Sequence, residues 1–81
     1  MIKDSILKLS KGNDLTYSEA YDTMDEIMSG FTTEVQMSAY LTALSIKGAS
    51  IDEITASAEA MRTHCIRLLN DEEVLEIVGT G

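Results

Sequence analysis

Three residues near the end of the chain, Gly79, Thr80 and Gly81, have the types and spacing of a phosphate-binding turn. They follow an apolar run over residues 74–78 that predicts a short β-strand. Glycines permit positive φ and a close approach of backbone N–H groups to an anion, and such a turn normally opens a helix whose N-terminus favours negative charge. Two glycines one residue apart are common in turns, and no lysine of a nucleoside-triphosphate loop stands beside them. The preceding strand is what favours the anion-binding interpretation.

Other side chains that could do chemistry are few and scattered. His64 and Cys65 form the only His/Cys pair, whereas a zinc site needs about four ligands. Cys65 falls on an apolar helical stripe, so we expect a buried structural thiol, with His64 partly exposed at its edge. Asp22, Asp25 and Glu26 could be metal ligands, but a solvated helix face is the favoured interpretation. We therefore predict no catalytic residue and no metal ligand in this chain.

The expected fold class is all-α, a small bundle of about four helices. A lone strand at 74–78 cannot satisfy its ladder hydrogen bonds, and no other segment has the pattern of a strand. Residues 1–69 are therefore expected to form a helical domain. Residues 70–81 are expected to be a linker, a strand and the start of a glycine-rich loop that belong to a larger α/β domain outside this chain. The chain would then be part of a longer protein.

Apolar periodicity and capping signals place the four helices. They are expected from Ile2 to about Lys11, from Thr16 to Ser29-Gly30, from Thr32 or Thr33 to Gly48, and from Ser50 to the acidic linker at residue 70. Capping boxes are expected for Thr16 with Glu19, Thr33 with Gln36 and Ser50 with Glu53.

The third expected helix carries apolar residues on two sides, which predicts that it packs on more than one side and is central to the bundle. Its stripes are Met37, Leu41 and Leu44, and Val35, Ala39, Ala43 and Ile46, with the small hydroxyls of Ser38, Thr42 and Ser45 between them. The fourth helix has one stripe at alternating spacings of three and four, which is expected to be its buried face. That stripe is Ile51, Ile54, Ala58, Met61, Cys65 and Leu68.

Charge and composition exclude several classes of function. The net charge of −8 argues against a surface for nucleic acid or an anionic membrane. No apolar stretch approaches the roughly 18 residues that span a bilayer, and the N-terminus lacks the continuous apolar segment of a secretory signal. A single cysteine cannot form an internal disulfide, which favours a cytoplasmic location.

From about Leu7 onward the chain resembles the N-terminal helical domain of the anthranilate phosphoribosyltransferases. The residues that carry the resemblance are Asp25-Glu26-Ile27-Met28-Ser29-Gly30, Gln36, Ala39, Tyr40, Leu41, Ala43, Leu44, Lys47-Gly48, Asp52-Glu53-Ile54, Ala60-Met61-Arg62 and Ile77-Val78-Gly79-Thr80-Gly81. The layout is shared more distantly with the pyrimidine nucleoside phosphorylases. The closing glycine loop favours the transferases, because the phosphorylases are expected to have a basic-His-Ser-Thr-Gly sequence there.

The resemblance implies a full-length enzyme of tryptophan biosynthesis that joins anthranilate to the ribosyl carbon of phosphoribosyl pyrophosphate, with magnesium present. It implies that Gly79, Thr80 and Gly81 bind these substrates, and that the charged donor-binding and metal-binding residues lie beyond residue 81. It also implies a homodimer through the first and third helices, which carry more apolar surface than a four-helix monomer needs to bury. The chain alone is expected to be inactive. The alternatives are a phosphorylase or a related phosphoribosyltransferase paralogue, and a stand-alone helical interaction module.

Overall fold

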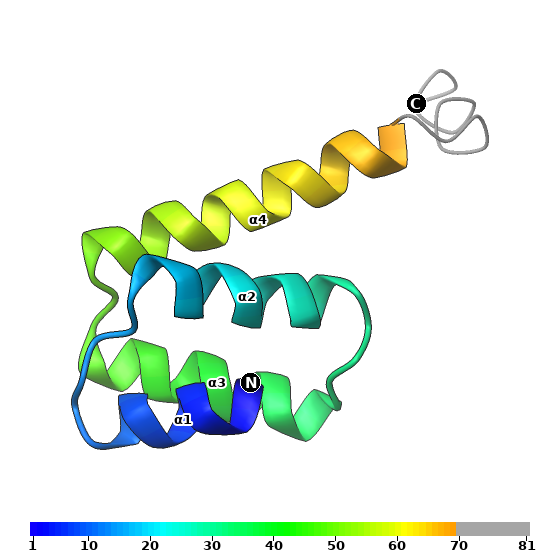
Figure 1. The fold of residues 1–81 in the computed structure, drawn as a ribbon. Helices are drawn as coiled ribbons and strands as arrows, with labels where there is room; N and C mark the ends of the chain where they lie inside the picture. Colours follow the sequence, from blue (N-terminus) through cyan, green and yellow to red (C-terminus); the bar gives the residue numbers. More distant parts are fainter. Residues whose placement is uncertain (70–81) are drawn as a thin grey trace.

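The computed structural model describes residues 1–69, which form four α-helices (Figure 1). They are α1 (Ile2–Ser10), α2 (Tyr17–Met28), α3 (Glu34–Lys47) and α4 (Ile51–Leu69). The predicted all-α fold and the positions of the four helices are confirmed for this part of the chain. The strand predicted at 74–78 and the linker before it lie outside the described residues.

Side-chain caps begin three of the helices at the predicted positions. The capping boxes are Thr16 with Glu19, Thr33 with Gln36 and Ser50 with Glu53. Thr33, and not its neighbour Thr32, caps α3, because its Oγ1 accepts the Gln36 backbone N–H at 3.1 Å. At the other end of α3, Gly48 has a φ of 89° and donates its N–H to the Leu44 carbonyl. A left-handed conformation at this position favours glycine, which explains where the helix stops.

The helices pack as two pairs. The most extensive contact is between α2 and α4, followed by that between α1 and α3, and a smaller contact between α1 and α2 joins the pairs. In Figure 1, α2 accordingly lies between α4 and the α1–α3 pair, and α4 slants away from α2 toward its C-terminal end. None of the helices in the described part of the chain combines the length and the hydropathy that crossing a bilayer requires.

The prediction that the third helix is central is wrong. α3 packs mainly on α1 and buries only Tyr40, while Val35 and Ile46 are 78% and 83% exposed. Because apolar residues surround this helix, its sequence pattern does not indicate which side will find a partner. One side packs, and the others are left at the surface of residues 1–69.

The predicted buried face of α4 is also wrong. The helix turns small residues toward α2 and buries Ala56, Ser57 and Ala60 together with the carboxylate of Glu53. The apolar stripe that includes Ile51 and Cys65 is exposed instead. Small side chains let α2 and α4 approach closely, which explains why this face is the one that packs. The apolar core consists of Ile2, Leu9, Leu15, Ala20, Met24, Tyr40, Ala56 and Ala60.

Candidate functional site

The phosphate-binding turn predicted at Gly79, Thr80 and Gly81 lies outside the described residues and stays a prediction. Within residues 1–69, no group of three or more His, Cys, Asp or Glu side chains is arranged to hold a metal ion. The features that remain are a buried ion-pair network and two apolar surfaces.

The ion-pair network joins the loop after α1 to the loop between α3 and α4. The Glu53 carboxylate is fully buried, and one of its oxygens accepts the Leu15 backbone N–H at 2.7 Å. Its other oxygen accepts from the Ser50 backbone N–H at 2.7 Å and from the Lys47 ammonium at 2.8 Å. Lys47 also donates to the Asp14 carboxylate at 2.6 Å. Two loops far apart in the sequence are thereby held to one another.

The network favours the charged forms of Glu53 and Lys47. Burial raises the pKa of Glu53. The hydrogen bonds from Lys47, Ser50 and Leu15 lower it by more than burial raises it, so the pKa lies below its usual range. Burial lowers the pKa of Lys47, but the hydrogen bonds to Asp14 and Glu53 outweigh it and leave the pKa raised. A general acid or base needs a pKa near the working pH. The pKa of Glu53 is lowered and that of Lys47 is raised, so both pKa values move away from neutral pH, which is typical of a structural ion pair and not of a general acid or base.

The side chains around His64 differ in part from the sequence interpretation. His64 Nε2 lies 2.7 Å from an Asp25 carboxylate oxygen, and only 12% of the His64 side chain is exposed. Glu26 also makes a tertiary contact, because it accepts the Ile2 backbone N–H at 2.9 Å. The interpretation of Asp22, Asp25 and Glu26 as a merely solvated helix face is thus wrong for Asp25 and Glu26. Asp22 is exposed, as that interpretation expects. The prediction that Cys65 is buried is wrong as well.

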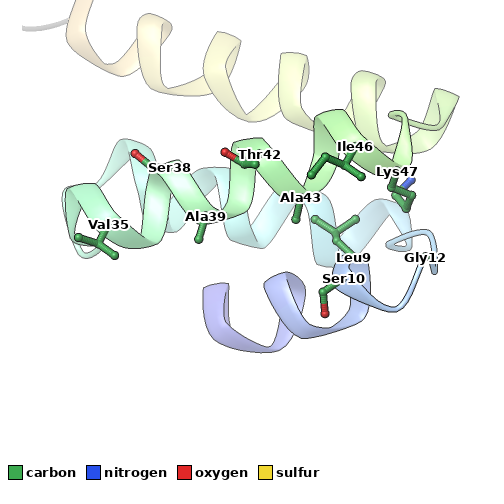
Figure 2. Close-up of a pocket in the computed structure, with 10 residues that line it drawn as sticks. All are labelled: Leu9, Ser10, Gly12, Val35, Ser38, Ala39, Thr42, Ala43, Ile46 and Lys47. Carbon is green, nitrogen blue, oxygen red and sulfur yellow. The ribbon is translucent and has the colours of Figure 1, made fainter.

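The first apolar surface is a groove along α1 and α3 with an open volume of about 770 Å³ (Figure 2). It is lined by Leu9, Ser10, Gly12, Val35, Ser38, Ala39, Thr42, Ala43, Ile46 and Lys47. In Figure 2, Ala39 and Ala43 point from α3 toward the side on which α1 and Leu9 lie. We call this surface the α1–α3 groove. Its small residues form a floor, and the exposed Val35 and Ile46 lie toward its two ends.

The second apolar surface is the outer face of α4, turned away from its contact with α2. Its larger members are all exposed: Ile51 has 83% of its surface accessible to solvent, Ile54 58%, Met61 42% and Leu68 53%. Ala58 and Cys65 lie between them and are exposed too. We call these six residues the α4 outer face. They share no residue with the α1–α3 groove.

Sequence reasoning missed the importance of Tyr40 and Leu15, both almost fully buried. Leu15 precedes the cap Thr16, and the core residue Ala20 follows four positions after that cap. This is the spacing of a hydrophobic staple, so the signal for Leu15 was present. No comparable local signal distinguishes Tyr40 from its neighbours on α3.

The four-helix fold and these surfaces define a helical bundle domain, and comparison with known proteins identifies its family. Residues 3–65 match the helical bundle domain of the glycosyl transferase family, and the chain belongs to this family. The family resemblance seen in the sequence is therefore confirmed.

Three similar curated proteins are named anthranilate phosphoribosyltransferase. The chain is 73% identical to that of Methanobrevibacter smithii, 58% identical to that of Lachnoclostridium phytofermentans and 46% identical to that of Lacticaseibacillus paracasei. Each match covers all 81 residues of this chain and 24% of the relative. The chain thus spans about a quarter of the length of these relatives. No solved structure matches it.

Proposed function

We propose that this chain is the helical N-terminal domain of an anthranilate phosphoribosyltransferase. Such an enzyme transfers the phosphoribosyl group of phosphoribosyl pyrophosphate to anthranilate in tryptophan biosynthesis. One observation carries the proposal: the whole chain is 73% identical to a relative of that name while covering 24% of it. The names of the relatives favour the transferase over a pyrimidine nucleoside phosphorylase or another paralogue. We place the enzyme in the cytoplasm.

In this proposal residues 1–69 are the dimerisation domain and form one side of the substrate cleft, and residues 70–81 begin the catalytic α/β domain. Gly79, Thr80 and Gly81 would present backbone N–H groups to the pyrophosphate leaving group without a side chain in the way. The net charge of −8 is unsuited to binding a polyanionic donor. Positive side chains and the ligands for magnesium would therefore come from the polypeptide after residue 81.

A chimera tests this proposal. We expect the isolated chain to show no transferase activity, and the Methanobrevibacter smithii relative to stay active when this chain replaces its first 81 residues. Within that chimera, Gly79→Val should lower kcat on the order of 100-fold, because a branched side chain would block the oxyanion contacts. Rates of anthranilate consumption with phosphoribosyl pyrophosphate give the readout.

Two controls make the result decisive. The relative without its first quarter should be inactive, and circular dichroism should show that the chimera is folded. A folded but inactive chimera would contradict the proposal and favour the stand-alone interaction module, as would activity in the isolated chain.

We also propose that the α1–α3 groove is the contact of a homodimer. An exposed apolar patch of this kind is uncommon on a soluble monomer. Association into a two-fold symmetric dimer is the commonest way to bury such a patch. Val35 and Ile46 project near the ends of the groove, while Ala39 and Ala43 leave room on its floor. In a two-fold pair, the projecting side chains of one copy can enter the floor of the other. The groove is therefore suited to self-association.

Sedimentation equilibrium tests the dimer. The chain should associate at micromolar concentration to twice its mass of 8.9 kDa. Ile46→Glu should weaken association by a factor on the order of 100, because it places a charge in an apolar contact. Leu41→Glu is the matched control, since Leu41 is an exposed residue of the same helix outside the groove. Equal weakening by both variants would show that the groove is not the contact.

A further inference from the structure

The loop between α2 and α3 presents the ring of Phe31 to solvent on a fixed backbone. The Gly30 N–H donates to the Ile27 carbonyl at 3.1 Å, and Gly30 has a φ of 79°. The Phe31 N–H donates to the Glu26 carbonyl at 3.2 Å. These two bonds form a Schellman motif, in which an apolar residue at the position of Phe31 usually packs on the side chain of the acceptor residue or the one before it. Here both are acidic, Glu26 and Asp25, and Phe31 is 81% exposed.

Phe31 continues the apolar surface of the α1–α3 groove. It precedes Val35 by four residues at the N-terminal end of α3, and Val35 lines one end of the groove. Both side chains are apolar and mostly exposed. Large aromatic side chains are enriched among the residues that anchor protein interfaces, because they bury much area with few rotatable bonds. Phe31 therefore extends the surface assigned above to the homodimer, although it does not line the groove of its own chain.

The opposite end of the groove is open enough to receive a ring. Figure 2 shows Leu9, Gly12 and Ile46 at the end opposite Val35. A Cβ built on Gly12 would meet no atom within 4 Å, so another side chain can approach the backbone there. Leu9 and the exposed Ile46 give this end an apolar lining. We call it the Gly12 end of the groove.

A two-fold axis that sets α3 antiparallel to α3 of a second copy brings the two ends together. A two-fold contact uses the same patch on both copies, so Phe31 of each copy meets the Gly12 end of the other. The charges favour this orientation. Glu34 is near Phe31, Lys11 is next to Gly12, and both are exposed. The antiparallel pair places these opposite charges near one another, whereas a parallel pair would bring Glu34 near its own copy.

We propose that Phe31 of each chain inserts into the Gly12 end of the α1–α3 groove of a second copy, with the two α3 helices antiparallel. This inference rests on the proposed function, because it names the anchor of the homodimer described there. It makes the loop between α2 and α3 a part of the interface, and it fixes the relative direction of the two copies.

A tryptophan at position 31 tests the insertion. The chain has no tryptophan of its own, so Phe31→Trp provides a single fluorescent reporter. Its emission should shift to shorter wavelength as the protein concentration rises through the range of dimerisation, because the indole ring leaves water. Adding Ile46→Glu to this variant should abolish the shift. Ser18→Trp is the control: Ser18 is exposed on α2 outside the groove, so its emission should not depend on concentration.

Sedimentation equilibrium gives a second measurement. Phe31→Ala should weaken association on the order of tenfold, because it removes the anchoring ring. Circular dichroism should show an unchanged fold, since the ring is exposed in the single chain. Leu41→Ala is the matched control: Leu41 is an exposed apolar residue of α3 outside the groove, and its truncation should leave association unchanged.

The outcomes separate this inference from the proposed function. A dimer in which the tryptophan at position 31 stays in water would overturn the inference and leave the homodimer standing. A shift that is the same at every concentration would show that the ring packs on its own chain, and a shift seen only in the chimera would assign its cover to the polypeptide after residue 81. Either result would overturn the inference, while the activity of the chimera would still test the proposed enzyme.

Discussion

Replacing Glu53 with alanine is expected to lower the free energy of unfolding by about 3–5 kcal/mol, the usual cost of removing one partner from a buried ion pair. The variant leaves the buried Lys47 ammonium without its Glu53 partner, and it removes the acceptor for the Leu15 and Ser50 backbone N–H groups. Small domains have free energies of unfolding at the low end of the usual range, about 5 kcal/mol, so such a loss is close to the total stability of this domain. Urea denaturation followed by circular dichroism measures it.

The matched control is Asp52→Ala, which removes a carboxylate from the neighbouring exposed position in the first turn of α4. It should cost less than about 1 kcal/mol, because only the interaction with the helix dipole is lost. Equal destabilisation by the two variants would show that the buried network is not what stabilises the loops.

The same carboxylate predicts a dependence of stability on pH. The pKa of Glu53 is lower in the folded chain than its ordinary value of 4.5, so the unfolded chain binds more protons in acid. The contribution of Glu53 is fully present above pH 4.5 and is lost as the pH falls through the lowered pKa of the folded chain. The Glu53→Ala variant should therefore lose stability less steeply in this range than the unmodified chain.

Replacing Tyr40 with alanine is expected to cost about 3–5 kcal/mol, as for other large buried aromatic side chains. Tyr40 is fully buried, and it is the only buried residue of α3. Its removal opens a cavity where α3 reaches the rest of the core. Thermal and urea unfolding would show a largely unfolded variant at room temperature.

Tyr40→Phe separates packing from hydrogen bonding. Within residues 1–69, the buried Tyr40 hydroxyl makes no hydrogen bond of standard geometry, although the buried hydroxyl of Ser57 on α4 lies beside it. Removing an unpaired buried hydroxyl should cost less than about 1 kcal/mol or be stabilising. A loss for Tyr40→Phe as large as that for Tyr40→Ala would contradict this account and assign the stabilisation to the hydroxyl.

The sequence by itself determined where the helices begin and end. Caps and stops depend on contacts between residues three or four apart, so Thr33, Ser50 and Gly48 carried this information locally. The family was also determined, because its motifs extend along nearly the whole chain. The glycine turn at residues 79–81 stays a sequence prediction.

Only the tertiary structure decided which faces of α3 and α4 pack. α3 is apolar on several sides, and α4 carries one face of small residues and another of larger apolar ones, so periodicity allowed more than one choice. The α2–α4 contact uses the small face, and the larger apolar face is exposed in residues 1–69. The Glu53–Lys47–Asp14 network was likewise decided in space. Asp14 lies in the loop after α1, Lys47 ends α3 and Glu53 is in the first turn of α4, and only the packed helices bring them together. Capping is a local interaction that sequence spacing encodes, whereas the choice of a packing face depends on every surface that competes for it.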